Sequence, residues 1–197
     1  MSSIQELIEQ LDAADGNVRA RALADLVAMG TAATADLQLA LGSPNPRLRA
    51  RVAQGLAEIA NPASAEALVQ ASHDGDEEVR SRGAYGLARM GDPRAIEALL
   101  RTFDDFPDVL HNPFTLSTYG LIELGARALP AVVPLLKSPQ PMTRTRAFAV
   151  IQALARSLPE GKDWPALWRS LGSYGPNAEA AERDRAADLW IEWAAKR

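Results

Sequence analysis

The 197-residue sequence contains no cysteine, so disulfides, thiolate metal ligands and a thiol nucleophile are excluded together. Only two histidines are present, His73 and His111, and neither has a recognised metal-ligand spacing. The sequence also lacks a Gly-x-Ser-x-Gly element and a glycine-rich phosphate loop. We therefore predict no catalytic residue, no metal and no cofactor, and we expect a protein that is not an enzyme.

An excess of basic charge is also missing. The 21 basic and 25 acidic side chains give a formal net charge of −4, which provides no basic field to hold a nucleic acid. No apolar run approaches membrane-spanning length, and the N-terminus has no basic stretch followed by an apolar one. We expect a soluble, cytoplasmic protein that binds neither nucleic acid nor membrane.

What the sequence does contain is an internal repeat. Its clearest copy is an Arg-x-Arg pair that begins at Arg80, with the apolar Leu87 seven positions later and the small Gly91 eleven positions later. The same register starts at Arg19, Arg49, Phe114, Arg144 and Arg183. Copies of one pattern that follow each other at a similar spacing along the whole chain are typical of a stacked array of helical hairpins.

The apolar patterns have helical period throughout, and none alternates as a strand would. We expect helices at about 18–29, 33–41, 47–59, 63–72, 77–90, 94–103, 129–136 and 178–195. We therefore predict an all-α fold, a right-handed α-solenoid of about five helical hairpins with helical caps. The whole chain, 1–197, is expected to form a single domain, with a capping helix in 1–14, repeats in 15–158 and a tryptophan-rich capping repeat in 159–197.

The aromatic residues are unevenly distributed. All four tryptophans lie near the C-terminus, at Trp164, Trp168, Trp190 and Trp193. We interpret them as large side chains that cover the end of the stack. The alternative is an exposed aromatic binding face.

The two arginines of each pair point in different directions, because residues two apart on a helix are rotated by roughly 200°. The first column comprises Arg19, Arg49, Arg80 and Arg144. We predict that it reaches carbonyl or acidic groups in the turns between repeats, such as Asp15, Asp74 or Asp76. The second column, expected on an outer surface, comprises Arg21, Arg51, Arg82 and Arg146. A continuous phosphate-binding track is the alternative, but Phe114 and Leu116 interrupt it.

The second helix of each hairpin offers the candidate binding surface. Its outward positions mix acidic, basic and apolar residues, which suits a protein or peptide better than a nucleic acid. The segment 104–113 is longer than the other turns, and long loops on rigid scaffolds often carry function. The predicted partner-binding residues are Glu66, Gln70, Glu97, Arg101, Phe106 and His111. The alternatives are that the polar columns are simply solvated and that Phe106 fills an irregular junction.

The stretch from Asp76 to Leu99, which contains Val79-Arg80 and Gly91-Asp92-Pro93, resembles the short HEAT-like repeats known from phycobilin lyase subunits. The resemblance covers about residues 4 to 195. It implies HEAT-like hairpins and leaves function open, because such arrays serve lyases, hydroxylases and adaptors alike. Our first hypothesis is a non-catalytic scaffold that recognises another protein or peptide through a concave face. The alternative is a bilin lyase or lyase-like chromophore-handling subunit.

Overall fold

The computed structural model describes residues 2–107 and 113–197. Within these ranges the regular structure is α-helix and 3-10 helix, and extended pairing is limited to one isolated bridge between Pro107 and Thr115. The predicted fold class, an all-α solenoid of helical hairpins, is confirmed. The chain forms two compact units, Met1–Phe106 and Pro107–Arg197, so single-domain behaviour stays a prediction.

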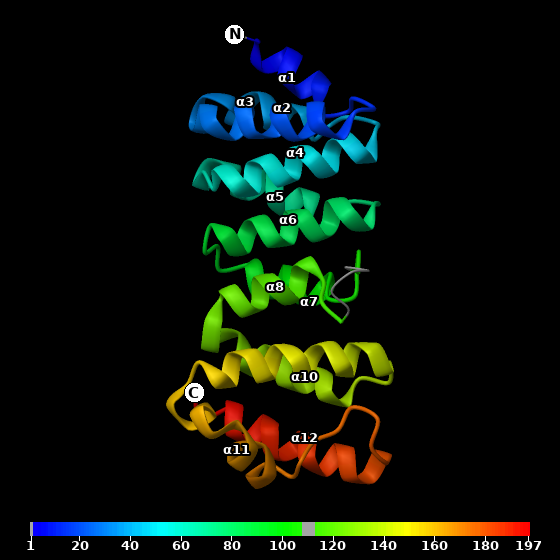
Figure 1. Ribbon diagram of the computed structural model, residues 1–197, viewed down its shortest axis with the longest axis vertical. Helices are drawn as coiled ribbons and strands as arrows, with labels where there is room; N and C mark the ends of the chain where they lie inside the picture. The colour runs from blue at the N-terminus through cyan, green and yellow to red at the C-terminus, as the bar shows by residue number, and fades with distance from the viewer. Residues whose placement is uncertain (1, 108–112) are drawn as a thin grey trace. The chain divides into compact units, whose positions relative to one another are not determined.

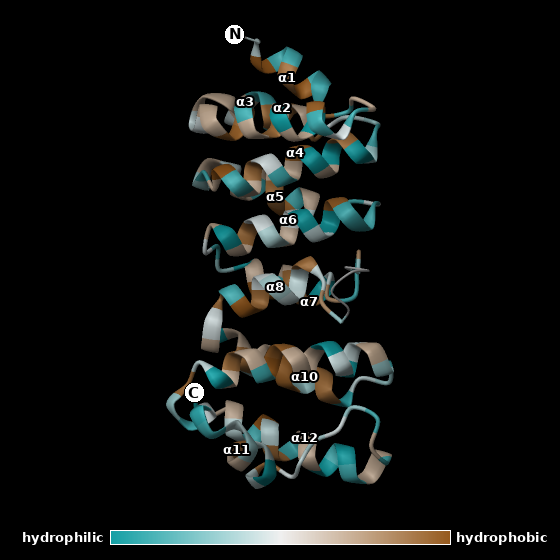
Figure 2. Cartoon of the chain, viewed as in Figure 1, coloured by the Kyte–Doolittle hydropathy of each residue, from teal (hydrophilic) through white to brown (hydrophobic). Residues whose placement is uncertain are grey.

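The first unit alternates long first helices with short second helices (Figure 1). Its helices are α1 (Ile4–Gln10), α2 (Gly16–Met29), α3 (Thr34–Ala40), α4 (Pro46–Ile59), α5 (Ala65–Ala71), α6 (Glu77–Arg89) and α7 (Ala95–Arg101). The long helices α2, α4 and α6 pack side by side, with α3 and α5 against them. Figure 2 shows hydrophobic and hydrophilic segments alternating along each long helix, as expected when one side is packed.

The repeat register places apolar side chains in the core of the first unit. Leu26, Leu56 and Leu87, each seven positions after the first arginine, are fully buried. Leu37, Leu68 and Leu99 of the second helices are fully buried as well. Burial of a leucine side chain contributes about 1.5–3 kcal/mol to stability, so these buried leucines supply much of the stability of the first unit.

Local sequence signals begin and end the long helices. The side chains of Asp15, Asn45 and Asp76 accept hydrogen bonds from backbone N–H groups in the first turns of α2, α4 and α6. At the other end, Gly30, Ala60 and Gly91 have positive φ angles of 58°, 52° and 67°. A positive φ stops a helix, which explains why the repeat keeps a small residue at this position.

Close packing of α5 against α6 depends on glycine. A Cβ atom on Gly83 would lie 2.5 Å from the backbone nitrogen of Ser72, and one on Gly86 would lie 2.8 Å from Leu68 Cδ1. No side chain fits at the first of these positions without movement of the backbone. The two helices therefore approach more closely than alanine would allow.

The second unit contains α8 (Leu116–Glu123), α9 (Leu129–Val132), α10 (Pro141–Arg156), α11 (Trp164–Ser170) and α12 (Ala180–Ala194). The helix expected at 129–136 is α-helical only to Val132 and continues as a 3-10 turn, Val133–Lys137. Pro134 explains the change, because it has no N–H group to donate within an α-helix.

Aromatic side chains form much of the core of the second unit. Trp190 is fully buried and packs its ring against Phe148, Trp164 and Trp193, with centroids 6.4, 5.7 and 5.4 Å away. Trp168 donates a hydrogen bond from Nε1 to the carbonyl of Tyr174. The tryptophans therefore pack against other residues of the second unit, as we interpreted them, and do not form an exposed binding face.

The first arginine column links successive turns, as predicted. Arg49 Nη1 donates to the carbonyls of Ser43 and Pro44, and its Nε and Nη2 donate to the Asp74 carboxylate at 2.8 and 2.7 Å. This hydrogen bond holds the pKa of Asp74 below its ordinary value. Arg80 repeats the arrangement with the carbonyls of Asp74 and Gly75.

The second arginine column is not uniformly on an outer surface, so this prediction was wrong in part. Arg146 is buried, with 7% of its surface exposed, and its Nε donates to the carbonyl of Pro113. Arg82 is half-buried and pairs with Glu78 and Gln54. The arginine stem is long enough to turn along the helix surface and find acceptors on neighbouring elements. Arg21 is exposed, as expected.

No helix in the described residues is both long enough and apolar enough to span a lipid bilayer.

Candidate functional site

The candidate site is the outward side of the second helices α3, α5 and α7 in the first unit. We call this surface the second-helix face, defined by Leu39, Glu66, Gln70, Glu97 and Arg101. All five residues are exposed, and Leu39 exposes 78% of its surface. The structure thus places four predicted binding residues on one surface and adds Leu39, whose exposed apolar side chain stands in register with Gln70 and Arg101.

Glu97 and Arg101 lie one helical turn apart on α7. Their side chains approach to 3.8 Å, and 86% of the Glu97 side chain is exposed. A pair this exposed and this loose contributes little to stability. Arg101 also donates from Nη2 to Ser72 Oγ at 3.1 Å, which orients the guanidinium over the end of α5. Both side chains therefore lie at the surface, and their pairing adds little to stability.

Arg94, at the start of α7, belongs to the same surface and was missed from the sequence. It donates to Glu66 at 2.6 Å and to both oxygens of Asp92 at 2.8–2.9 Å. These hydrogen bonds raise the pKa of Arg94 and lower the pKa of Asp92. The Asp-Pro-Arg sequence at residues 92–94 could have predicted this pair, because an aspartate two residues before an arginine can bind it across a turn.

Side-chain hydrogen bonds set the spacing of neighbouring second helices. Gln5 on α1 donates from Nε2 to Asp36 Oδ1 on α3 at 2.9 Å. Gln38 on α3 donates to the carbonyl of Ala63, beside α5, at 2.8 Å. The Glu66 to Arg94 pair continues the series to α7. The second-helix face is thus cross-linked along its length, which favours a preformed surface.

Two shallow depressions separate the second helices. The one between α3 and α5 has a volume of about 360 Å³ and is lined by Gln38, Leu39, Leu41, Gly42, Ala67, Gln70, Ala71 and Asp74. The one between α5 and α7 is about 170 Å³ and is lined by Ser72, His73, Arg94, Glu97 and Arg101, among others. Both depressions have mixed linings, with Leu39 and Leu41 beside Gln70 in the first and Val69 and Leu87 beside the charged side chains in the second.

The remaining predicted binding residues lie after α7. Phe106 is 36% exposed and has a φ angle of +45°, but it lines neither depression. His111 lies outside the described residues, so its role stays a prediction. In the described part of the chain, no three histidine, aspartate or glutamate residues gather as metal ligands.

Comparisons with known proteins agree with this architecture. A family model described as HEAT repeats matches residues 33–112. No curated protein matches the sequence. The fold is similar to a chain in the complex of CpcE and CpcF of phycocyanin lyase from Nostoc sp. PCC7120, with 19% identity, a TM-score of 0.54, and 98% of this chain and 88% of that chain covered.

Two engineered helical-repeat structures are also similar. One engineered protein has 17% identity and a TM-score of 0.46, with 100% of this chain and 98% of that chain covered. A designed armadillo repeat protein has 16% identity and a TM-score of 0.45, with 96% and 99% covered. The predicted resemblance to HEAT-like repeat proteins of the phycobilin lyase type is therefore confirmed, by the family model over residues 33–112 and by the similar fold of the phycocyanin lyase chain.

Proposed function

We propose that this protein is a non-catalytic scaffold that binds another protein or peptide through the second-helix face. The observation that carries the proposal is Leu39, an apolar side chain with 78% of its surface exposed beside a depression of about 360 Å³ that Leu41, Ala67 and Ala71 also line. An apolar anchor on the partner would bury both, and such anchors provide most of the binding energy at protein interfaces.

The charged pairs supply the specificity of the same surface. Glu66 with Arg94 and Glu97 with Arg101 present both signs of charge close together. Such a mixture favours a partner with complementary charges and disfavours a polyanion. The similar phycocyanin lyase structure is itself a complex of two chains, which supports association with another protein.

The proposal is tested by affinity capture with the immobilised full chain and with a Leu39→Glu variant. We expect the captured partner to be lost from this variant, because a charge at this position cannot enter an apolar contact without a desolvation cost. Met142→Glu is the matched control, since Met142 is also an exposed apolar side chain but lies on α10. Equal capture by wild type and Leu39→Glu would contradict the proposal.

Chromophore handling is the second candidate, and the similar fold of the phycocyanin lyase chain is the observation in its favour. The second-helix face offers the acidic residues Glu66 and Glu97, but its defining residues include no aromatic side chain to stack on a bilin. Incubation of the purified protein with a bilin separates the two candidates. An absorbance shift that Glu66→Gln or Glu97→Gln abolishes would favour the chromophore.

A further inference from the structure

The first long helix, α2, has one side that no other long helix of the described residues covers. α2 and α4 have 14 residues each, but α2 buries Ala22 and Leu26 alone, whereas α4 is packed between α2 and α6 and buries more of its surface. The uncovered side carries Val18, Arg21, Asp25 and Met29, all of them exposed. These residues recur every three or four positions and therefore share one side of the helix. We call this surface the α2 face.

The α2 face forms one wall of an open groove. The groove has a volume of about 870 Å³, and Leu7 and Gln10 of α1 line its other wall together with Ser2. Val18 and Met29, near the two ends of α2, expose 38% and 36% of their surfaces. A groove with an exposed apolar side chain near each end is a surface that a partner can cover.

Asp25 disfavours another hairpin stacked on α2 in the way that the repeats stack on one another. The same register position in α4 and α6 is Gly55 and Gly86. A Cβ atom on Gly55 would lie 3.4 Å from Leu23 Cδ1, and one on Gly86 would lie 2.8 Å from Leu68 Cδ1, both in preceding hairpins. A hairpin stacked on α2 would meet a carboxylate where the inner helices have no side chain. A partner that brings positive charge to Asp25 is favoured instead.

The α2 face is complementary to itself. Along the helix its residues are apolar, basic, acidic and apolar, in the order Val18, Arg21, Asp25 and Met29. In an antiparallel pair of α2 helices centred beside Leu23, Arg21 lies opposite Asp25 of the second copy and Val18 lies opposite its Met29. Two-fold symmetry makes each of these contacts twice. A parallel pair would place Arg21 against Arg21.

The two charges of the α2 face are available to a second copy. Arg21 and Asp25 lie four positions apart, yet neither forms an ion pair within the part of the chain that the structure describes. Opposite charges that meet across an interface fix its orientation and register. The charge pattern therefore favours the antiparallel arrangement of two copies.

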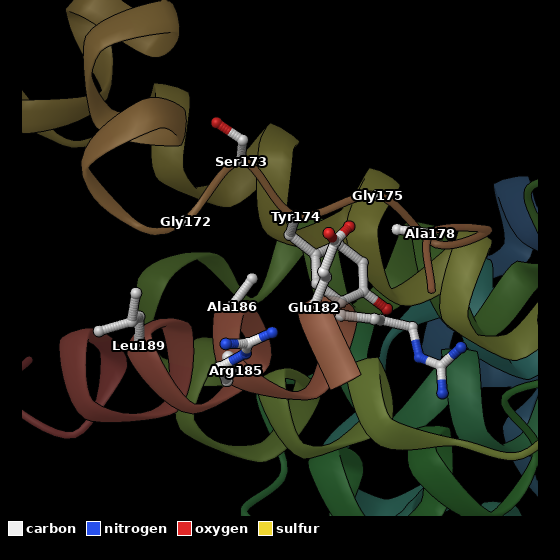
Figure 3. A pocket seen from close by; sticks show the side chains of 10 residues that line it. Gly172, Ser173, Tyr174, Gly175, Ala178, Glu182, Arg185, Ala186 and Leu189 are labelled. Carbon is white, nitrogen blue, oxygen red and sulfur yellow. The ribbon is translucent and has the colours of Figure 1, made fainter. Parts of the chain in front are cut away.

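The last long helix, α12, does not offer such a surface. Its residues Glu182, Arg185 and Leu189 border a cavity of about 340 Å³ whose opposite wall is the loop 172–175 (Figure 3). A Cβ atom on Gly172 of this loop would lie 3.1 Å from Ala186 and 3.2 Å from Leu189. The loop thus already packs on this side of α12 and takes the place of a second helix.

We propose that the α2 face binds the α2 face of a second copy of this chain, in an antiparallel two-fold dimer. Two ion pairs between Arg21 and Asp25 hold its centre, and contacts of Val18 with Met29 close its two ends. A 14-residue helix is about 21 Å long, so the interface is small and the dimer forms reversibly with concentration. The α2 face shares no residue with the second-helix face, so its test is independent of the proposed function.

The first test is sedimentation equilibrium of the full chain over a series of concentrations. We expect a dimer whose dissociation constant rises about tenfold or more in Arg21→Asp and in Asp25→Arg, because each change sets like charges opposite one another. The two variants alter the net charge in opposite directions, so a loss in both is not an effect of net charge. Arg169→Asp, at an exposed position on α11, is the matched control and should dimerise like the wild type.

Two results of this test would overturn the proposal. One is a wild-type chain that stays monomeric up to about 1 mM, and the other is a dimer that neither charge variant weakens. An equimolar mixture of Arg21→Asp and Asp25→Arg is the decisive arm, because one copy then has two acidic and the other two basic residues at the centre of the interface. We expect the mixture to dimerise although each variant alone does not. A mixture that stays monomeric would count against the ion pairs.

The second test measures the orientation of the two copies and keeps Arg21 and Asp25 in place, so it decides even where a charge variant fails to fold. The chain has no cysteine, so a single spin label can be attached at Asn17→Cys or at Ala24→Cys, both exposed positions on α2. Asn17 lies further from the two-fold axis than Ala24. We expect the distance between the two labels of the dimer to be longer for Asn17→Cys by roughly 10 Å. Equal distances would rule out the antiparallel pair.

Discussion

Arg80 and Asp105 form an ion pair that joins the start of α6 to the turn after α7, with Nε and Oδ2 2.8 Å apart. The same guanidinium donates from Nη1 to the carbonyls of Asp74 and Gly75. The pKa of Arg80 is raised, first by the hydrogen bond to Asp105. One side chain therefore connects two successive turns of the first unit.

Arg80→Gln should lower the free energy of unfolding by about 1.5–3 kcal/mol, because hydrogen bonds to charged groups are lost. Arg183→Gln removes an equivalent arginine whose Nε has no hydrogen-bond partner among the described residues, so we expect a smaller loss. Urea denaturation followed by circular dichroism measures both. Equal losses would show that the acceptors of Arg80 do not matter for stability.

Gly83→Ala should destabilise the protein by about 1–3 kcal/mol or more, since overpacking at this position forces the backbone of α5 and α6 apart. The added Cβ would meet Ser72 N at 2.5 Å. Gly75→Ala is the control, because a Cβ there meets nothing within 4 Å, and we expect a change within about 0.5 kcal/mol. Thermal melts distinguish them, and similar midpoints for the two variants would count against the close contact.

Ala60→Gly should stabilise the protein by up to about 1 kcal/mol. Ala60 has a left-handed backbone, with φ 52° and ψ 35°, which costs a residue with a Cβ about 1–2 kcal/mol. Ala155 has the same place in the repeat register but lies inside α10, so Ala155→Gly should instead cost about 0.5–1 kcal/mol. Denaturation midpoints that move in the same direction would contradict this prediction.

The buried Tyr174 side chain should make the folded protein less stable at high pH. Its pKa is raised from 10.0 to about 12, mainly by burial. Between these two values the unfolded chain releases the proton while the folded chain keeps it, so the free energy of unfolding falls as pH rises through this window. In Tyr174→Phe this part of the pH dependence should disappear. Denaturation of both proteins at pH 9 to 12 measures it, and parallel pH curves would be the contrary result.

The double variant Arg101→Glu with Phe106→Ala should abolish binding of a partner captured by the wild type and leave the melting temperature nearly unchanged. Both side chains are partly exposed, and the Glu97 to Arg101 pair is loose at 3.8 Å. Arg47→Glu, at an exposed position on α4, serves as the control. Retained binding would exclude the two residues from the site, and loss of folding would support the junction-filling role of Phe106.

Local signals were enough to predict the helices of the first unit closely. The helix expected at 77–90 is α6 (Glu77–Arg89), and the one expected at 18–29 is α2 (Gly16–Met29). Capping side chains, helix-stopping residues with positive φ and 3.6-residue periodicity all act within a few positions, so the sequence alone expresses them. The turn-directed role of Arg49 and Arg80 was predictable for the same reason, because their carbonyl acceptors lie only five or six residues away.

Contacts between repeats were decided by the tertiary structure. Arg146 and Arg82 have equivalent places in the sequence, yet one is buried against Pro113 and the other pairs with Glu78 on the same helix. The Arg94 to Glu66 bridge could not be predicted from the sequence, and neither could the buried Arg183 Nε, which has no hydrogen-bond partner in the described part of the chain. Periodicity determines which side of a helix a residue occupies. Only the folded chain determines which atoms of another repeat, 25 or more residues away, come within hydrogen-bonding distance of it.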